Sequence, residues 1–553
     1  MRRWAPALFL AIACAGVWGQ AAVPAPTAPA AAGEYTISGV VVNERTGQAL
    51  PRVTMTLGDT AKRRIAAQTT TDEEGSFRFD HLATGRFDLV GERHGYVTQS
   101  YQQHEGGVST AILTGEGKPS TGLRFTMRQQ ATVFGNVVED SGDPVPRAQV
   151  LLFAKQQVGG TEKIAMVHQE TANEAGEYEM THLVPGSYYL CATGTPWYAQ
   201  RMGMGRRAEA DAPRSPLDVS YGTTCYPGAT DPAEAEMVDV RAGDRLELPV
   251  TMHAVPSVRV VMRIPAGPQG QVLTIPSFRT EIFGTTEFVQ AGGLSIMPSP
   301  DADHSDAEHR ELVATANLAP GQYQATFQGQ NGQAERVMAL NAGAETVALD
   351  SAAAVEEAGV SGTAAMADGG AIPRFLTVSL YRAVGDRHAA EVHPGGDFRI
   401  GSVPAGEYEL RVESGVGRLG IAQMSAKGAA LRGGVLTVGA EPVTLNLSVF
   451  EGTGTVAGVV QSGNATAGGV FLLLVPEDRH APAVANQSDS DGSFEFQHVL
   501  PGKYTAVAIE DGWTLQWGSR DVVEHYLAGG ERITVPNEAR TVTLPEPLQA
   551  QAK

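Results

Sequence analysis

Residues 75–89 read GSFRFDHLATGRFDL, and this stretch decides the fold. Apolar and polar residues alternate up to a small-residue turn at 83–85 and then alternate again. A period of two on both sides of a turn is typical of two half-buried strands, because successive side chains of a strand point to opposite faces. The apolar spacing does not fit a helix. The stretch therefore predicts a β-hairpin whose apolar face lies in a core.

The same pattern returns later in the chain. The copies read GEYEMTHLVPGSYYL at 176–190, GDFRIGSVPAGEYEL at 396–410 and GSFEFQHVLPGKYTA at 492–506, with a degraded copy at 313–325. In each copy we expect the turn glycine to allow a positive φ and the aromatic residue two positions later to point into the core. The turn glycines are Gly85, Gly186, Gly321, Gly406 and Gly502. A repeated hairpin predicts tandem domains of one kind.

A second signature precedes each well-formed copy. It reads SGVV at 38–41, FGNV at 134–137, SGTA at 361–364 and AGVV at 457–460. Its glycine lies 36, 41, 34 and 34 residues before the first glycine of the hairpin. Further short strands bring each unit to about seven strands, the size of a small β-sandwich. We therefore expect an all-β fold of tandem seven-stranded antiparallel β-sandwich domains.

The repeat spacing divides the chain into five such domains behind an N-terminal leader. The second domain carries an insertion at 195–240, and the third is divergent. The expected segments are a signal peptide at 1–20, an Ala/Pro-rich linker at 21–34, and sandwiches at 35–128, 131–252, 256–350, 355–450 and 453–546.

The leader predicts export. Arg2 and Arg3 precede an apolar run from Trp4 to Val17, which is shorter than the roughly 20 residues that span a membrane. We therefore expect cleavage and a periplasmic, cell-surface or secreted protein without a transmembrane span in the mature chain. Cys14 lies in a weak match to a bacterial lipoprotein box, and we expect no lipid anchor there.

The charge restricts the partners. The chain has 41 Lys and Arg against 61 Asp and Glu, a net charge of −20, which becomes −22 without residues 1–20. An acidic surface repels phosphate, so we expect no nucleic-acid partner.

Two cysteines remain after cleavage. Cys191 and Cys225 can form a disulfide in an oxidising compartment, and two free thiols are the alternative. Cys191 alternates with the inward-facing Tyr188 and Leu190 and should face away from the core. The bond would therefore attach the insertion to the sheet.

Together, the two signatures resemble the carboxypeptidase regulatory-like domain, a transthyretin-like sandwich related to Cna protein B-type repeats and to the carbohydrate-binding-like fold. The resemblance covers four of the five domains well and the third poorly. It implies a non-catalytic accessory or surface module without a cofactor. The intramolecular Lys–Asn isopeptide bonds of some Cna-like repeats need a lysine in the first strand, and no first strand here has one.

Enzyme-like patterns have simpler explanations. His388 and Glu391, with His498 further on, mimic zinc carboxypeptidase spacing, but they fall in different repeats. The acidic loop at 301–309 lacks the glycine of a calcium loop, so we expect a solvated loop, with weak divalent-cation binding as the alternative. The stretch Asp489–Gly492 is explained by turn chemistry. We therefore expect no catalytic residue and no metal ligand.

Loop aromatics provide the other candidate site. Aromatic faces can stack on sugar rings, and the alternative is that they pack over a sandwich end or against the next domain. The candidates for glycan stacking are Tyr101, Trp197, Tyr198, Trp513 and Trp517. We thus expect a non-catalytic exported structural or interaction protein, with polysaccharide binding as the alternative and a metallohydrolase as a remote one. Its partner is expected to be a polysaccharide or an envelope protein, and the sequence does not determine the ligand, the compartment or the oligomeric state.

Overall fold

The computed structural model describes most of the chain from residue 33 onward. The described segments are 33–104, 108–200, 215–265, 274–298, 311–329, 336–343, 346–351, 355–356, 358–381, 387–415, 419–432, 434–439, 441–478 and 483–553. The predicted signal peptide and almost all of the predicted linker lie outside these residues, as does the acidic loop at 301–309.

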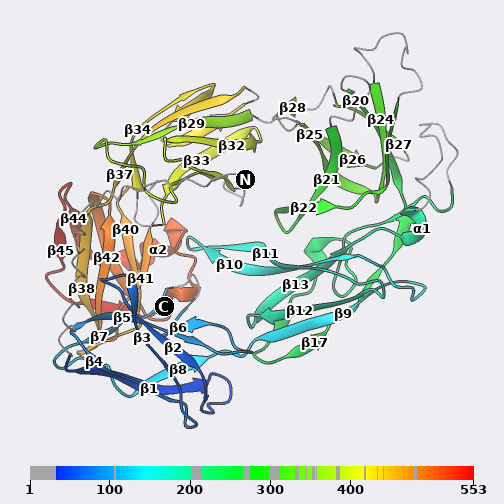
Figure 1. Cartoon of the computed structure of the whole chain (residues 1–553). Helices are drawn as coiled ribbons and strands as arrows, with labels where there is room; N and C mark the ends of the chain where they lie inside the picture. The colour runs from blue at the N-terminus through cyan, green and yellow to red at the C-terminus, as the bar shows by residue number, and fades with distance from the viewer. Residues whose placement is uncertain are drawn as a thin grey trace, which may run out of the picture.

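The first sandwich consists of two sheets that face each other across a hydrophobic core (Figure 1). One sheet has the order β4-β1-β8, and the other has the order β3-β2-β5-β6 with β7 also paired to β5. Phe77, Phe79 and Phe125 in this core are at most 4% exposed. The strands are β1 (Tyr35–Asn43), β2 (Thr54–Asp59), β3 (Arg64–Thr70), β4 (Ser76–Leu82), β5 (Gly85–Glu92), β6 (Gln99–Ser100), β7 (Ile112–Thr114) and β8 (Leu123–Met127).

The second sandwich carries the predicted insertion. Its sheets have the orders β12-β9-β17, with β18 also on β9, and β11-β10-β13-β15, with β16 also on β13. The elements are β9 (Ala131–Glu139), β10 (Gln149–Val158), β11 (Thr161–Thr171), β12 (Glu177–Leu183), β13 (Gly186–Thr193), α1 (Trp197–Gln200), β14 (Val219–Tyr221), β15 (Thr224–Cys225), η3 (Pro232–Glu234), β16 (Val238–Val240), β17 (Arg245–Glu247) and β18 (Val250–Met252). The strand β19 (Ala254–Pro256) pairs with β14 at the junction to the next domain.

The third and fourth sandwiches each have a four-stranded and a five-stranded sheet among the described residues. The third contains β20 (Val258–Pro265), β21 (Thr274–Ile282), β22 (Thr285–Val289), β23 (Gly292–Pro298), β24 (Glu311–Leu318), β25 (Gly321–Gly329), β26 (Arg336–Ala342), β27 (Thr346–Asp350) and β28 (Val355–Glu356). The fourth contains β29 (Ala358–Met366), β30 (Thr377–Tyr381), β31 (Arg387–Glu391), β32 (Asp397–Val403), β33 (Gly406–Glu413), β34 (Leu419–Lys427), β35 (Ala429–Arg432), β36 (Val435–Val438) and β37 (Val443–Glu451).

The fifth sandwich is completed by a strand beyond the expected end at 546. This last strand, β46, pairs in parallel with both β38 and β43 and so connects the two layers. The elements are β38 (Gly454–Ser462), β39 (Ala465–Thr466), β40 (Phe471–Pro476), β41 (Val484–Gln487), β42 (Ser493–Val499), β43 (Gly502–Ile509), η6 (Gly512–Thr514), α2 (Arg520–Leu527), β44 (Glu531–Val535), β45 (Thr541–Thr543) and β46 (Leu548–Gln551).

The predicted fold class, an all-β array of tandem sandwiches, is confirmed, and the structure adds at least one parallel pairing to each domain. The first strand of each sandwich lies antiparallel to the hairpin strand on one side and parallel to a late strand on the other. A parallel neighbour arises because the chain crosses between the sheets before it returns beside its own first strand.

The two sequence signatures pair directly in space. In four domains, the glycine of the first strand lies opposite the first aromatic residue of the hairpin, and these pairs are Gly39–Phe77, Gly135–Tyr178, Gly362–Phe398 and Gly458–Phe494. A side chain would not fit at these glycines. A Cβ on Gly362 would lie 2.0 Å from the carbonyl oxygen of Leu445 and 2.9 Å from the Phe398 ring. Because glycine has no side chain, both neighbouring strands can approach the first strand closely at this position.

The turn glycines have a different role from the one expected. Gly85, Gly186 and Gly321 do not have a positive φ, whereas Gly502 has a φ of 156°. Instead, the aromatic ring two residues later folds back over the glycine, as Tyr323 does at 3.3 Å from the position of a Cβ on Gly321. In the four copies where this residue is tyrosine, its hydroxyl donates to the carbonyl oxygen four residues upstream, as in Tyr408 to Pro404 at 2.8 Å and Tyr504 to Leu500 at 2.8 Å, whereas the first copy has Phe87 and lacks the bond. This bond is the tyrosine corner of sandwich folds.

Positive φ values occur earlier in the repeat. The first glycine of each well-formed hairpin has φ between 74° and 89°, at Gly75, Gly176, Gly396 and Gly492. The histidine shared by three copies also has a left-handed backbone, with φ of 59° at His81, 62° at His182 and 56° at His498. Each of these histidines lies at a register shift between the hairpin strand and the first strand. The repeated histidine is thus explained by a bulge, because histidine tolerates this conformation better than most residues.

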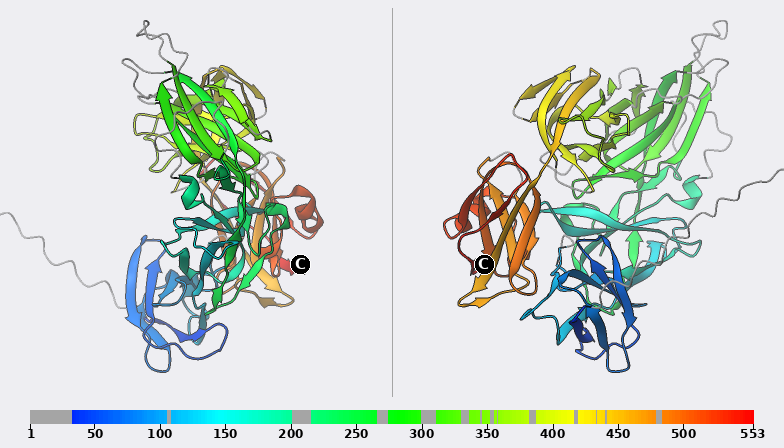
Figure 2. Two further views of the ribbon diagram at one scale, coloured as in Figure 1. Left: turned by 90° about the vertical axis from the view of Figure 1, so that its right-hand side faces the viewer. Right: turned by 60° about the vertical axis from the view of Figure 1, so that its left-hand side comes forward.

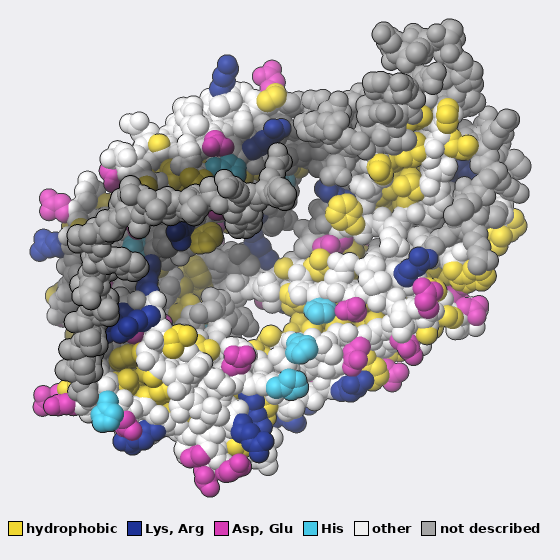
Figure 3. Space-filling model, in the orientation of Figure 1, with side chains coloured by type: hydrophobic (Ala, Val, Ile, Leu, Met, Phe, Trp, Pro, Cys, Tyr) yellow, Lys and Arg dark blue, Asp and Glu magenta, His cyan; other side chains and the backbone are white. Residues whose placement is uncertain are grey.

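The domains are arranged in a closed circuit. The first domain, drawn in blue, lies beside the fifth, drawn in orange to red, in the views of Figures 1 and 2. The space-filling view shows an opening between the domains (Figure 3). The contacts that close this circuit therefore join parts of the chain that are far apart in sequence.

The close approach at Gly362 yields a prediction with a control on the same strand. Gly362→Ala should destabilise the fourth domain by about 1–3 kcal/mol, because the added methyl group overlaps the backbone of β37. Gly359→Ala should have little effect, since nothing lies within 4 Å of its Cβ position. Hydrogen–deuterium exchange of residues 358–366, together with thermal unfolding, measures both effects. Equal exchange in the two variants would contradict the steric explanation.

Candidate functional site at the domain junctions

The aromatic residues that the sequence suggested for glycan stacking do not form one platform. Tyr101 is 8% exposed and packs in the core of the first domain, with its ring centroid 6.3 Å from that of Phe125. The expectation of an exposed stacking face is therefore wrong for Tyr101, because its loop turns back over the open edge of its own sandwich.

Trp513 and Trp517 lie where the fifth domain meets its neighbours. Trp513 stacks on His104 of the first domain with ring centroids 4.5 Å apart and an interplanar angle of 2°, and it meets Phe471 of its own domain edge-on at 4.6 Å. Burial lowers the pKa of His104, which favours the neutral ring in this stack. Trp517 packs over the β10–β11 turn of the second domain, where a Cβ on Gly160 would lie 2.2 Å from the indole. Both tryptophans are thus used between domains.

Trp197 and Tyr198 belong to the short helix α1, which contacts β23 of the third domain. The Tyr198 hydroxyl donates to Glu139 Oε1 at 2.6 Å. Burial and this hydrogen bond raise the pKa of Tyr198 to about 12. Trp197 lies edge-to-face with Tyr198 and is 47% exposed, which makes it the most exposed of the five candidates.

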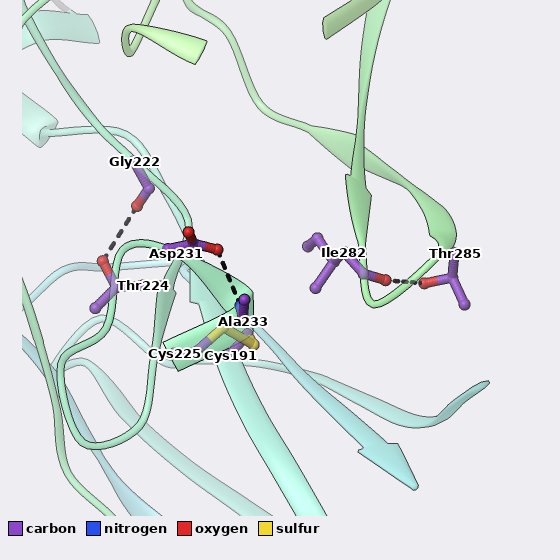
Figure 4. The surroundings of a disulfide bond; sticks show 8 residues. All are labelled: Cys191, Gly222, Thr224, Cys225, Asp231, Ala233, Ile282 and Thr285. Atoms are coloured by element: carbon purple, nitrogen blue, oxygen red, sulfur yellow. Dashed lines mark hydrogen bonds between the residues drawn. A yellow bond between two sulfur atoms is a disulfide. The ribbon is translucent and has the colours of Figure 1, made fainter. Parts of the chain in front are cut away.

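The predicted disulfide is present and also lies at a junction (Figure 4). Cys191 on β13 and Cys225 on β15 are opposite each other in the ladder, and their S–S distance is 2.04 Å. Both are fully buried, although Cys191 faces away from the core of its sandwich, because Ile282 and Phe283 of the third domain cover this outer face. The bond attaches the insertion to the sheet, as expected, and it also forms part of the surface on which the third domain packs.

The first and fifth domains are joined by a set of polar contacts that we call the closure contact. It consists of Arg86, Lys118, Gln102, Thr110, Ala111 and Leu113 of the first domain and Gln487, Asp489, Ser490 and Asp491 of the fifth.

An ion pair lies at the centre of the closure contact. Arg86 donates from Nε and Nη2 to the two carboxylate oxygens of Asp489, each at 2.9 Å, and the Asp489 side chain is only 4% exposed. Burial raises the pKa of Asp489, and the bonds from Arg86 offset this effect in part. Lys118 pairs with Asp491 beside it. Burial alone would raise the pKa of Asp491, but the bonds from Lys118 and Ser493 hold it below its ordinary value.

Uncharged groups complete the closure contact. The Ser490 amide donates to the carbonyl oxygen of Ala111 at 2.9 Å, and the Leu113 amide donates to Ser490 Oγ at 3.2 Å. Gln487 Nε2 donates to the Gln102 carbonyl oxygen at 3.1 Å. Backbone groups on both sides fix the register, so the contact is specific as well as charged.

The same turn is used differently in other repeats. Asp72 of the first domain accepts from the amides of Glu74 and Ser76 through Oδ1, at 3.1 and 2.7 Å. Asn173 of the second does the same with the amides of Ala175 and Glu177, each at 2.9 Å. Asp72 and Asn173 thus stabilise turns, which is the role predicted for them.

The fifth domain keeps the backbone of this turn, but the side chain that accepts from the Ser493 amide is Asp491, through Oδ1 at 3.0 Å, and not Asp489. The Asp489 amide donates to the carbonyl oxygen of Ser493 at 2.7 Å, as in the other repeats. Its carboxylate turns instead to Arg86. Sequence reasoning missed Arg86, Lys118 and Asp489 as binding residues, because the motif around Asp489 is fully explained as a turn.

The enzyme-like patterns are not assembled into a site. His388 and Glu391 lie on the strand β31 of the fourth domain, and His498 lies in the bulge of the fifth with its Nδ1 3.4 Å from Glu451 Oε1. Among the residues that the structure describes, no group of three or more His, Cys, Asp or Glu side chains is placed to hold a metal ion.

A polar groove of about 570 Å³ lies on the second domain. Phe134 forms part of its wall, and the Arg245 guanidinium covers this ring at 4.6 Å while pairing with Glu179 at 3.0 Å. The charges of its arginine and of one glutamate are therefore already paired within the domain.

The fold and these contacts define a multi-domain protein built of β-sandwiches, and many of the polar and aromatic groups described above lie between domains. Residues 36–128 match the family model of the carboxypeptidase regulatory-like domain, which confirms the resemblance seen in the sequence. Residues 450–527 match a second family model, the second β-sandwich domain of BOS complex subunit NOMO1-like proteins. No curated protein matches the chain. In the described part of the chain, no helix is both long and apolar enough to cross a membrane.

Solved structures with tandem β-domains are similar only at a low level. The Bacillus anthracis TIE protein is 10% identical over 75% of this chain and 74% of its own, with a TM-score of 0.17. The minor pilin GBS52 of Streptococcus agalactiae is 10% identical over 40% of this chain and 97% of its own, with a TM-score of 0.21. The shaft pilin SpaA of Lactobacillus rhamnosus GG is 9% identical over 40% and 98%, with a TM-score of 0.18. At these TM-scores, the likenesses carry no conclusion about this chain.

The central ion pair yields a second prediction. Arg86→Ala should weaken the closure contact by about 3–5 kcal/mol, because it leaves the buried Asp489 carboxylate without a partner. The double variant Arg86→Ala with Asp489→Ala should recover part of this loss, since no unpaired charge remains. Small-angle scattering measures whether the first and fifth domains separate. Thermal unfolding of the single and double variants measures the coupling energy between Arg86 and Asp489.

The matched control is Arg78→Ala. This arginine belongs to the same domain and pairs with Asp80 on an exposed surface. It should change neither measurement. Additive effects of the two substitutions at Arg86 and Asp489 would contradict the assignment of this pair as the centre of the contact.

Proposed function

We propose that the protein is an exported, non-catalytic structural or interaction protein of the cell envelope or exterior. The observation that carries the proposal is the closure contact: residues 403 positions apart, Arg86 and Asp489, form a nearly buried bidentate ion pair between the two terminal domains. Charged side chains that could otherwise bind a ligand are thus engaged in holding the two domains together.

A fixed arrangement of sandwiches suits a scaffold. The junction between the second and third domains is packed around the disulfide, and that between the second and fifth around Trp517. With the domains held in this way, loops at the free ends of the sandwiches keep a constant spacing. Loops on a rigid support are where binding residues are commonly found. The partner would be an envelope protein or a polymer.

Two features support export. The basic residues and apolar run at the N-terminus have the composition of a signal peptide. The Cys191–Cys225 bond belongs to a compartment that keeps cysteines oxidised.

Export is tested by fractionation and N-terminal sequencing of the native protein. The mature chain should begin near residue 21, occur outside the cytoplasm and contain no free thiol when denatured without reductant. The variant Leu10→Arg interrupts the apolar run and should keep the chain uncleaved in the cytoplasm. A wild-type chain that retains residues 1–20 in the cytoplasm, with both cysteines reduced, would overturn the proposal.

Polysaccharide binding is a second candidate, and one observation favours it. Trp197 is 47% exposed at the junction of the second and third domains, and an open indole face can stack on a sugar ring. The net charge of −20 favours a neutral glycan over an acidic one.

A glycan panel tests this candidate. If a neutral glycan binds, Trp197→Ala should weaken binding about tenfold, corresponding to about 1.4 kcal/mol of lost stacking. The control is Trp513→Ala, which should leave binding unchanged because that ring is enclosed between His104 and Phe471. Absence of binding by the wild-type chain, or equal binding by Trp197→Ala, would remove the polysaccharide candidate and leave a protein partner.

A further inference from the structure

The closure contact joins two different surfaces. The first domain contributes the cations Arg86 and Lys118, and the fifth contributes the anions Asp489 and Asp491. A contact between unlike surfaces is heterologous, so it can form within one chain or between two chains. The charge complementarity makes either form specific for this pair of domains.

Neither surface is needed to fold the domain that carries it. The hydrophobic cores of the first and fifth domains have no residue in common. The turn that contains Asp489 has the same backbone bonds as the turn at Asp72. Asp72 is exposed and takes no part in the closure contact, so this turn forms without a second domain against it. Separation of the two domains would therefore leave both folded.

The remaining junctions divide the molecule into two parts, which are the first three domains and the last two. The second and third domains pack together around Phe283 and through the Arg259–Asp218 ion pair at 3.3 Å. The fourth and fifth are also in contact, since a Cβ on Gly420 of β34 would lie 3.2 Å from the Leu500 side chain and Glu451 of β37 lies 3.4 Å from His498.

The chain passes from the third to the fourth domain after β28, whose two residues pair with β26. In Figure 1, β28 lies between these two domains. In the described part of the chain, domains four and five are joined to the rest at this connection and by the contacts of the fifth domain with the first and second.

We propose that two copies of this chain exchange these parts, so that the fifth domain of one copy docks on the first and second domains of the other. Both copies then form the same contacts that a single chain forms with itself. Within one chain, the linked domains face each other at an effective concentration on the order of millimolar, so the closed monomer predominates in dilute solution and exchange grows with concentration. This inference goes beyond the proposed function, since it rests on the closure contact and not on any ligand or compartment.

Charge reversal in separate chains tests the exchange directly. Arg86→Asp places like charges across the contact in one variant, and Asp489→Arg does so in another. Each full-length variant should be folded by circular dichroism but open in small-angle scattering. In an equimolar mixture, the exchanged pair restores opposite charges at both contacts. The mixture should therefore form a dimer of twice the 58.2 kDa chain mass, at a concentration roughly tenfold or more below that needed by either variant alone.

The control carries both substitutions in one chain and should return to a closed monomer. If either single variant fails to fold, the milder pair Lys118→Glu and Asp491→Lys is used in the same way. A mixture of folded variants that stays at the monomer mass in sedimentation velocity would overturn the proposal. A mixture that dimerises no better than each variant alone would overturn it as well.

Discussion

A glycine facing an aromatic ring across two strands is the contact on which the first, second, fourth and fifth sandwiches depend. In the fourth domain, Gly362 lies opposite Phe398, and the carbonyl oxygen of Leu445 approaches the same glycine from the other side. The first strand can therefore serve two neighbours at once, one antiparallel and one parallel. Any larger residue would push away one of these strands, so the sandwich would lose either its hairpin or its closing strand.

One turn serves two purposes in the repeated fold. The carboxamide or carboxylate that stabilises the turn in the first two domains is, in the fifth, released to bind an arginine of another domain. The backbone of the turn is unchanged, because its own amide bonds, the left-handed glycine and the bond from the Ser493 amide to Asp491 hold it. A repeat can thus acquire a binding residue without any change in its local fold.

The aromatic residues show how domain packing changes a functional interpretation. Trp513 and Trp517 have the polar surroundings of ligand-binding loop residues, yet both are covered by neighbouring domains. Among the five candidates, only Trp197 is classed as exposed, at 47%. The structure therefore favours a protein whose aromatic residues mainly fix its shape, and it leaves one position where a sugar ring could stack.

The amino-acid sequence by itself determined the hairpins, the β-sandwich fold of the domains and the outward direction of Cys191. These features depend on period-two alternation, turn residues and signatures no more than 41 residues apart, all of which local sequence encodes. It did not show that the turn glycines serve a tyrosine corner, because that role depends on where a ring folds back. Only the tertiary structure decided that Arg86 meets Asp489 and that tryptophans lie between domains. Such contacts depend on the placement of whole domains, and no local pattern records that placement.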